Sequence, residues 1–156
     1  MSNSNIYPDY RPCVGILLFK PSQGIWAGRR IDKFKEAWQM PQGGIDPGEN
    51  PQLAALRELQ EETSITSAKI IKEIDGWHKY EIAVELRPAF WAGKYIGQQQ
   101  KWFIMEFTGQ EAEINIATQD QEFIEWDWVT PEFLLKNTVA FKKEVYHKIL
   151  AEFTKL

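Results

Sequence analysis

The sequence of 156 residues contains a single cysteine, Cys13, so no disulfide can form within the chain. Small secreted domains are usually rich in disulfides, and this chain does not belong to that class. We therefore expect a reducing, cytoplasmic environment and no disulfide partner. Cys13 lies inside an apolar run, which favours a buried structural thiol over a nucleophile.

Long apolar segments are also missing. No uninterrupted apolar run approaches the roughly 20 residues that a membrane-spanning helix needs. The opening residues, MSNSNIYPDYRP, are polar and contain proline, so they lack the apolar core of a signal peptide. We expect a soluble protein with no membrane partner.

An excess of positive charge is absent as well. The chain has 18 Lys and Arg against 22 Asp and Glu, a formal net charge of −4. General nucleic-acid binders are usually basic, so this class is disfavoured. An enzyme that holds only the end of a nucleic acid needs few basic residues and is compatible with this charge.

The residues that are present have the composition of a globular protein, with 44% hydrophobic and 26% charged residues. No internal repeat, low-complexity tract or linker divides the chain. We expect residues 1–9 to form a flexible lead-in and residues 10–156 to form a single domain.

Apolar runs and turn residues predict strands interleaved with three helices. The expected strands cover residues 13–19, 25–30, 68–74, 80–86, 101–107 and 123–129, and the expected helices begin at residues 51, 131 and 141. Asn50 is the expected N-cap of the first helix, with an apolar stripe at Leu53, Leu56 and Leu59. This order predicts a layered α/β domain.

Three carboxylates, Glu58, Glu61 and Glu62, lie within five positions of the first expected helix. They share one side of it, where like charges cost about 0.2–0.5 kcal/mol per pair. Arg57 is the only cation between Glu49 and Glu62. Most acidic clusters on helices are solvated surfaces. A glycine-rich loop runs directly into this helix, however, and clustered carboxylates bind hard cations such as Mg²⁺.

The stretch GGIDPGENPQLAALRELQEETSI, which begins at Gly43, resembles the box of the Nudix hydrolase family. That box reads Gly-x5-Glu-x7-Arg-Glu-U-x-Glu-Glu-x-Gly-U, where U is a bulky aliphatic residue, and every acid and spacing is present. Its last glycine is Ser64 here, at a position where left-handed geometry is common and serine costs about 1 kcal/mol. The resemblance implies a Nudix-type α/β/α sandwich with a mixed sheet between helices.

The resemblance also implies a pyrophosphohydrolase that acts on phosphorus–oxygen–phosphorus anhydride bonds with Mg²⁺ or Mn²⁺. The implied metal ligands are the carbonyl of Gly43 and the carboxylates of Glu58, Glu61, Glu62 and Glu122. One acid activates the attacking water, with Glu58 preferred over Glu61. Glu49 and Arg57 are the implied structural ion pair.

Segments outside the box narrow the resemblance. YRP from Tyr10, WQMPQGG from Trp38, GQQQKWF from Gly97 and the segments around Glu122 and Phe141 are similar to bacterial RNA pyrophosphohydrolases and to dinucleoside polyphosphate hydrolases of bacteria and plants. The RNA enzymes convert triphosphorylated or diphosphorylated 5′ ends to monophosphates, a step in mRNA decay. The other group cuts dinucleoside tetraphosphates asymmetrically.

The same resemblance implies substrate contacts. The candidates beside the phosphates are Arg11, Arg30 and Lys101, and the pair that matches a base-holding pair is Val139 and Phe141, which Lys142 adjoins. Tyr80 is a further candidate, although the loop that follows it differs from that of the RNA enzymes. Each cation also fits an ordinary surface position, and the phenylalanine also fits a core position of the last helix.

Several activities are therefore open from the sequence. RNA 5′ pyrophosphohydrolase is the leading expectation and dinucleoside polyphosphate hydrolase the second. A non-catalytic Nudix binding domain is a third, although such domains commonly lose box acids and none is missing here. The flanking segments resemble the enzymes that act on oxidised nucleotides or ADP-ribose less closely.

Overall fold

The computed structural model describes residues 8–32 and 34–156. The flexible lead-in expected for residues 1–9 falls almost wholly outside the described residues and stays a prediction. Within the described ranges, no helix combines the length and the apolar character needed to cross a membrane.

Strands and helices alternate along the chain. The strands are β1 (Tyr10–Lys20), β2 (Gly24–Arg30), β3 (Trp38–Gln39), β4 (Gln42–Gly44), β5 (Ala68–Glu73), β6 (His78–Glu81), β7 (Gly97–Phe107) and β8 (Phe123–Val129). The helices are α1 (Pro51–Thr63), α2 (Pro131–Asn137) and α3 (Lys143–Thr154), with 3₁₀ turns η1 (Val84–Ala89), η2 (Trp91–Gly93), η3 (Glu111–Glu113) and η4 (Ala140–Lys142). The three expected helices are confirmed.

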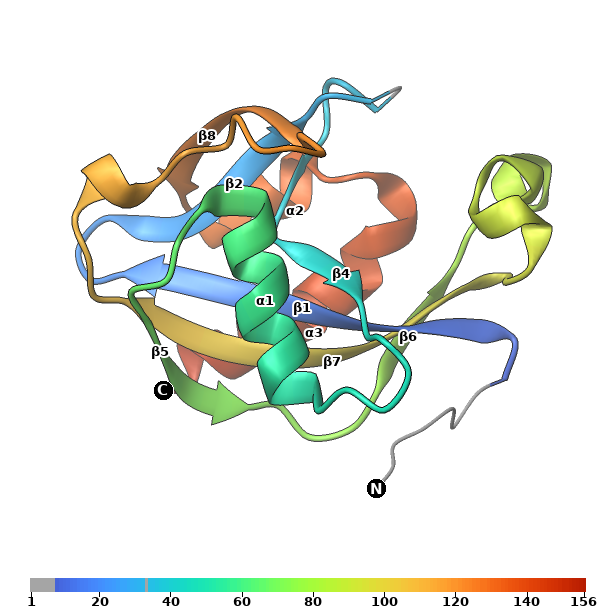
Figure 1. The fold of residues 1–156 in the computed structure, drawn as a ribbon, viewed down its shortest axis with the longest axis horizontal. Helices are drawn as coiled ribbons and strands as arrows, with labels where there is room; N and C mark the ends of the chain where they lie inside the picture. Colours follow the sequence, from blue (N-terminus) through green and yellow to red (C-terminus); the bar gives the residue numbers. More distant parts are fainter. Residues whose placement is uncertain (1–7, 33) are drawn as a thin grey trace.

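The described strands form one mixed sheet, whose main path runs β3-β2-β1-β7-β5. β1 and β7 are parallel, in register from Tyr10↔Gly97 to Phe19↔Glu106, whereas the other strand pairs are antiparallel. α1 covers one face of the sheet, and α2 and α3 lie on the other (Figure 1). The expected α/β/α sandwich with a mixed sheet is therefore confirmed.

The alternation of side chains along β1 explains why both faces of the sheet are covered. Val14, Ile16 and Leu18 pack beneath α1 with Leu59, whereas Leu17 packs in the opposite cluster. Cys13 is completely buried in this strand, and burial raises the pKa of its thiol to about 12. The expected burial of this thiol is confirmed.

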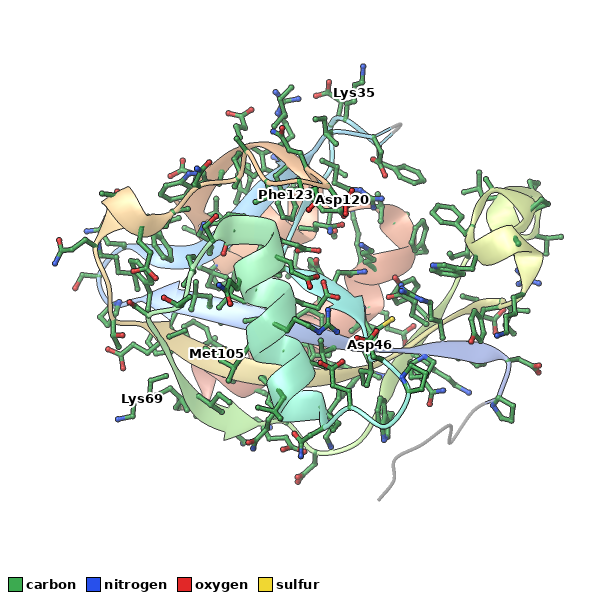
Figure 2. All side chains as sticks on the ribbon, viewed as in Figure 1. Lys35, Asp46, Lys69, Met105, Asp120 and Phe123 are labelled. Atoms are coloured by element: carbon green, nitrogen blue, oxygen red, sulfur yellow. The ribbon has the colours of Figure 1, made fainter. Side chains whose placement is uncertain are left out.

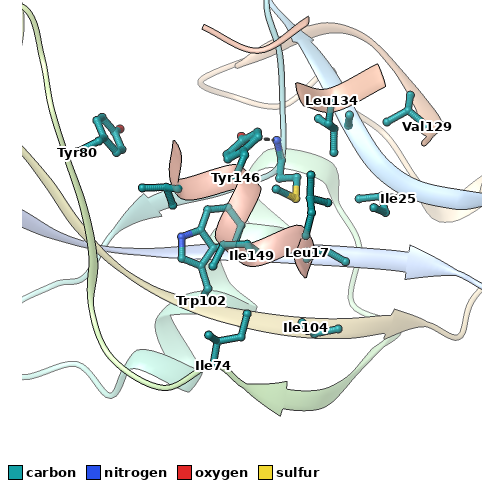
Figure 3. Close-up of a cluster of buried hydrophobic side chains, with 14 of the residues drawn as sticks. Leu17, Ile25, Ile74, Tyr80, Trp102, Ile104, Val129, Leu134, Tyr146 and Ile149 are labelled. Atoms are coloured by element: carbon teal, nitrogen blue, oxygen red, sulfur yellow. Dashed lines mark hydrogen bonds between the residues drawn. The ribbon is translucent and has the colours of Figure 1, made fainter. Parts of the chain in front are cut away.

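The cluster beneath α3 fixes the segment that leads into β4. The rings of Trp102 and Tyr146 meet edge to face at 5.8 Å between centroids, next to Ile149 (Figure 3). The Tyr146 hydroxyl accepts the N–H of Met40 at 2.8 Å. The last helix thereby holds the backbone just before the glycine-rich loop.

Both ends of α1 are capped, as the sequence predicts. The Asn50 side chain accepts the N–H of Gln52 at 2.7 Å. At the other end Ser64 adopts a left-handed φ of 67°, and its hydroxyl donates to the carbonyl of Asn115 at 2.8 Å. This hydrogen bond helps serine to hold a geometry that glycine usually supplies.

The buried side of α1 differs from the expected stripe. Leu53 is 62% exposed, so the first expected position is wrong. The buried positions instead include Ala55, Leu59 and Glu62, which follow one another at i, i+4 and i+7. A glutamate therefore occupies a position that faces the core.

The strand expected at residues 80–86 is wrong beyond Glu81, where β6 ends and the chain turns into η1. Pro88 has no N–H to donate to a strand ladder. Arg87 closes the turn instead, because its Nε donates to the carbonyl of Ile82 at 2.8 Å. Val84, within the expected strand, is 68% exposed.

Candidate functional site

An open pocket of about 580 Å³ brings together residues from distant parts of the chain. All five expected metal ligands line it: Gly43, Glu58, Glu61, Glu62 and Glu122. Five of the expected substrate contacts line it too: Arg11, Arg30, Tyr80, Phe141 and Lys142. Asp120, at the approach to β8, contributes a further acid to the lining (Figure 2).

Gly43 lies directly beneath the carboxyl group of Glu58. β4 pairs with β1 through Val14↔Gly43 and packs against α1. A Cβ at Gly43 would lie 2.0 Å from the Glu58 Cδ, so a side chain here would displace the carboxylate. The missing side chain lets the acidic helix and the loop meet.

Arg57 joins the loop to the helix. Its Nε and Nη2 each donate to Glu49 at 2.8 Å, and Nη2 also donates to the carbonyl of Gly44 at 2.9 Å. Its Nη1 donates to Glu58 at 2.9 Å and to Glu61 at 3.2 Å. The hydrogen bond from Arg57 holds the pKa of Glu49 below its usual value. One guanidinium therefore holds three carboxylates and the loop backbone.

Glu62 is only 7% exposed, and its carboxylate accepts the N–H of Gln42 at 3.3 Å. Burial raises the pKa of Glu62 well above its usual value, and the nearby charges of Glu122 and Glu58 raise it further. Burial also raises the pKa of Glu58 and that of Glu122. These three converging acids need positive charge among them.

Across residues 8–32 and 34–156, no three Asp, Glu, His or Cys side chains already stand in an arrangement that could hold a metal. Glu58 and Glu61 instead direct one oxygen each to Arg57. The donors around the pocket are nevertheless hard oxygens, the type that Mg²⁺ and Mn²⁺ prefer. The buried charge of Glu62 therefore fits a divalent cation.

Cations also line the pocket: Arg11 from β1, Arg30 from β2 and Lys142 from η4. Lys142 is buried, and its Nζ donates to the Gln39 side chain at 2.7 Å. Burial, together with the charge of Arg30, lowers the pKa of Lys142 to about 7. Arg30 pairs with Asp32 beside the pocket. The carboxylates and the cations thus share one space.

Aromatic rings complete the lining. The rings of Tyr80 and Phe141 lie 5.4 Å apart between centroids at 30°. The Tyr80 hydroxyl donates to Gln98 Oε1 at 2.8 Å, which holds the ring in place. This pair presents aromatic surface beside the charged groups.

The structure does not bring two of the expected substrate contacts into the pocket. Lys101 lies three positions after Gln98 on β7, so the two side chains point to opposite faces of the strand. Lys101 instead forms an ion pair with Glu73 at 3.4 Å. Val139 lines a neighbouring hollow with Phe34. Both residues lie within or beside segments of the sequence that resemble the family, but this did not show which way their side chains point.

Sequence reasoning missed several lining residues. Gln98 accepts the side-chain amides of Gln42 at 3.2 Å and Gln100 at 3.0 Å, within a buried polar network. Consecutive glutamines in an otherwise apolar strand were the available signal. Phe90 and Trp91 also line the pocket, from the segment after β6 whose conformation the sequence pattern misrepresents.

Comparisons with known proteins agree with this geometry. A family model described as the NUDIX domain matches residues 9–149. An RNA pyrophosphohydrolase of Roseobacter denitrificans is 45% identical over 146 residues, which cover 92% of this chain and 91% of that protein. An RNA pyrophosphohydrolase of Rickettsia typhi is 42% identical over 157 residues, which cover 99% and 98%.

Among solved structures, an Ap4A hydrolase binary complex from C. elegans superimposes with a TM-score of 0.66. It covers 92% of this chain and 99% of that one at 19% sequence identity, a level at which the likeness shows the fold alone.

Proposed function

Because the chain belongs to the Nudix family, we propose that it is a metal-dependent RNA 5′ pyrophosphohydrolase. In this reaction pyrophosphate leaves a triphosphorylated RNA 5′ end, and a 5′-monophosphate remains. The observation that carries the proposal is one pocket that joins converging carboxylates to cations and paired aromatic rings. The RNA pyrophosphohydrolases that are 45% and 42% identical over most of their length support it.

We assign the metal to the carbonyl of Gly43 and the carboxylates of Glu58, Glu61, Glu62 and Glu122, with Mg²⁺ or Mn²⁺ as the ion. Nudix hydrolases generally need a divalent metal. When bound, such an ion neutralises phosphate charge and lowers the pKa of the attacking water.

Glu58 is our first choice for the group that takes a proton from this water, and Glu61 is the alternative. Burial raises the pKa of Glu58, which makes its carboxylate a stronger proton acceptor. The hydrogen bond from Arg57 orients Glu58, and the pair of Arg57 with Glu49 braces the helix against the loop.

Arg11, Arg30 and Lys142 supply the positive charge that a polyphosphate needs, and Tyr80 and Phe141 supply aromatic surface for a base. Stacking of this kind is worth about 1–3 kcal/mol per base and tolerates different sequences. We also propose that the protein acts in the cytoplasm, which a role in RNA turnover and the lack of a disulfide support.

Dinucleoside polyphosphate hydrolysis is the second candidate, since the same acids and cations suit that substrate. A competition assay separates the two activities. The protein and Mg²⁺ meet equal concentrations of a short 5′-triphosphorylated RNA and diadenosine tetraphosphate, and chromatography separates the products.

Faster conversion of the RNA to its 5′-monophosphate is the expected result. Faster cleavage of the dinucleotide would reverse the order of the candidates. Failure to cleave either substrate with Mg²⁺ or Mn²⁺ would favour a non-catalytic binding domain.

A further inference from the structure

Residues 83–95, which we call the arm, connect β6 to β7 and project from the body of the molecule as two consecutive 3₁₀ turns (Figure 1). The arm closes a hairpin, since Glu81 pairs with Gly97 and the N–H of Ile82 donates to the carbonyl of Ile96. Phe90 and Trp91 of the arm line the pocket that also contains the carboxylates. The metal site and the base contacts assigned above do not use them.

The arm continues a row of aromatic rings that begins at Tyr80 and Phe141. Phe34, from the connection between β2 and β3, meets the edge of Phe141 at 6.1 Å between centroids. On its other side Phe34 lies parallel to Phe90 at 6.4 Å, with 11° between the ring planes. The ring centroids of Phe90 and Trp91 lie 5.5 Å apart. Separate segments of the chain thus build one row.

Arginine side chains accompany this row. The guanidinium of Arg30 lies 4.7 Å from the centroid of Phe34, and that of Arg11 lies 5.6 Å from the centroid of Trp91. Both arginines line the pocket. Rings interleaved with cations are the combination with which proteins hold single-stranded nucleic acid, because rings stack bases while cations hold phosphates.

The backbone of the arm is held in an unfavourable conformation at this row. Trp91 and Ala92 both have positive φ, 50° and 54°, although neither is glycine. L-residues rarely adopt this region, and such strain gathers at functional sites where the surroundings impose it. Here the strained pair keeps a tryptophan half-buried at the pocket.

We propose that Phe90 and Trp91 form a stacking platform for a second base of the RNA, beyond the base held at Tyr80 and Phe141. This inference rests on the proposed function and adds a specificity element to it. Successive nucleotides of RNA are joined by one phosphate, so their bases can follow a row in which only Phe34 separates the two ring pairs. In a dinucleoside tetraphosphate, four phosphates separate the bases, which suits this short spacing less well.

The test compares an intact four-nucleotide 5′-triphosphorylated RNA with copies that lack one base, at the second, third or fourth nucleotide. In the wild-type protein, removal of the base that stacks on the platform is expected to lower kcat/KM by about 5- to 150-fold. In Trp91→Ala and Phe90→Ala, the ratio of kcat/KM for intact RNA to kcat/KM for abasic RNA is expected to fall towards one. A purely structural role would lower both rates and leave the ratio unchanged.

Matched variants separate stacking from folding. Trp91→Phe keeps a ring and is expected to keep most of the ratio, whereas Trp91→Leu keeps apolar packing and is expected to lose it. Val84→Ala, 68% exposed on the same arm, is the control and is expected to match the wild type. Thermal unfolding of each variant shows whether the fold persists.

The outcomes distinguish the two proposals. If the wild type converts intact RNA and Trp91→Leu shows the same ratio as the wild type, the platform alone is overturned. The platform would also be overturned if removal of the base at none of the three positions lowered kcat/KM of the wild type. Failure of the wild type to convert RNA at all would overturn the proposed function and the platform with it.

Discussion

Glu62 shows how a single residue can point to a binding site. Its carboxyl group occupies a core-facing position of α1 and is 7% exposed. A buried carboxylate without a nearby positive charge costs several kcal/mol. The spacing of Glu62 from Leu59 and Ala55 was readable from the sequence, but its burial was not, because it depends on the elements packed around the helix. A cation bound among the acids, as proposed above, would offset that cost.

At Glu58, we predict a loss of chemistry without a loss of fold. Glu58→Gln removes the proton acceptor but keeps the shape of the side chain, so kcat is expected to fall about 10²–10⁴-fold. The thermal unfolding midpoint is expected to stay close to that of the wild type. Steady-state kinetics on triphosphorylated RNA measure the effect.

Glu144→Gln is the matched control, since Glu144 is exposed on α3 and does not line the pocket. Normal turnover by Glu58→Gln would remove this residue from the assignment.

Gly43→Ala is predicted to impair activity through the position of one carboxylate. The added methyl group would lie 2.0 Å from the Glu58 Cδ, so the carboxylate must move. Displacement of a reacting group by about 1 Å can cost on the order of 10²-fold in rate, which is the expected fall in kcat/KM.

Gly48→Ala provides the opposite case in the same loop. Gly48 has φ of 78° and no atom within 4 Å of an added Cβ, so alanine there costs about 1–2 kcal/mol of stability and spares activity. Equal kcat/KM for Gly43→Ala and the wild type would contradict the role given to the glycine.

At the scale of elements, local chemistry made α1 predictable and left the segment after β6 unpredictable. Asn50 caps α1 through hydrogen bonds to its own neighbours, so the sequence contains the whole signal. The alternation from Tyr80 to Leu86 also looks local, but a strand needs a partner along its length. Beyond Glu81 the chain turns away from β7, and Pro88 could not have paired.

The C-terminal cap of α1 gives a stability prediction. Ser64→Ala removes the hydrogen bond to the Asn115 carbonyl and keeps the left-handed φ of 67°, so the free energy of unfolding is expected to fall by about 0.5–1.5 kcal/mol. Ser64→Gly relieves the backbone and is expected to be about 1 kcal/mol more stable than Ser64→Ala. Urea unfolding measures both, and a reversed order would refute the argument.

The whole fold brings the five expected metal ligands and five of the seven expected substrate contacts to one pocket, although they lie far apart in the chain. The layered fold followed from the alternation of strands and helices and from the resemblance of the glycine-rich loop and α1 to a known box. The positions of Lys101 and Trp91 did not follow, because the register of β7 and the path of the arm decide them.

Divalent metal is predicted to stabilise the whole fold. If Mg²⁺ or Mn²⁺ binds among the carboxylates, the unfolding midpoint rises with metal concentration. At a metal concentration of 100 times Kd, the free energy of unfolding increases by about 2.7 kcal/mol. Glu62→Gln is expected to reduce this shift, and Glu144→Gln to keep it. Differential scanning fluorimetry measures the shift, and chelation of the metal is expected to abolish hydrolysis.

An unfolding midpoint that ignores Mg²⁺ and Mn²⁺ at millimolar concentration would contradict the metal assignment.

The hairpin that ends in the arm has a consequence for how substrate range can change. Residues 83–95 join the rest of the fold through β6 and β7, and the acids that we propose as metal ligands lie on α1 and ahead of β8. The tip of a hairpin can be lengthened, shortened or replaced while its strands keep their register. If the arm holds a base as proposed, selection can alter which nucleotides are accepted without changing the acids, and an engineer can graft a new tip for the same purpose.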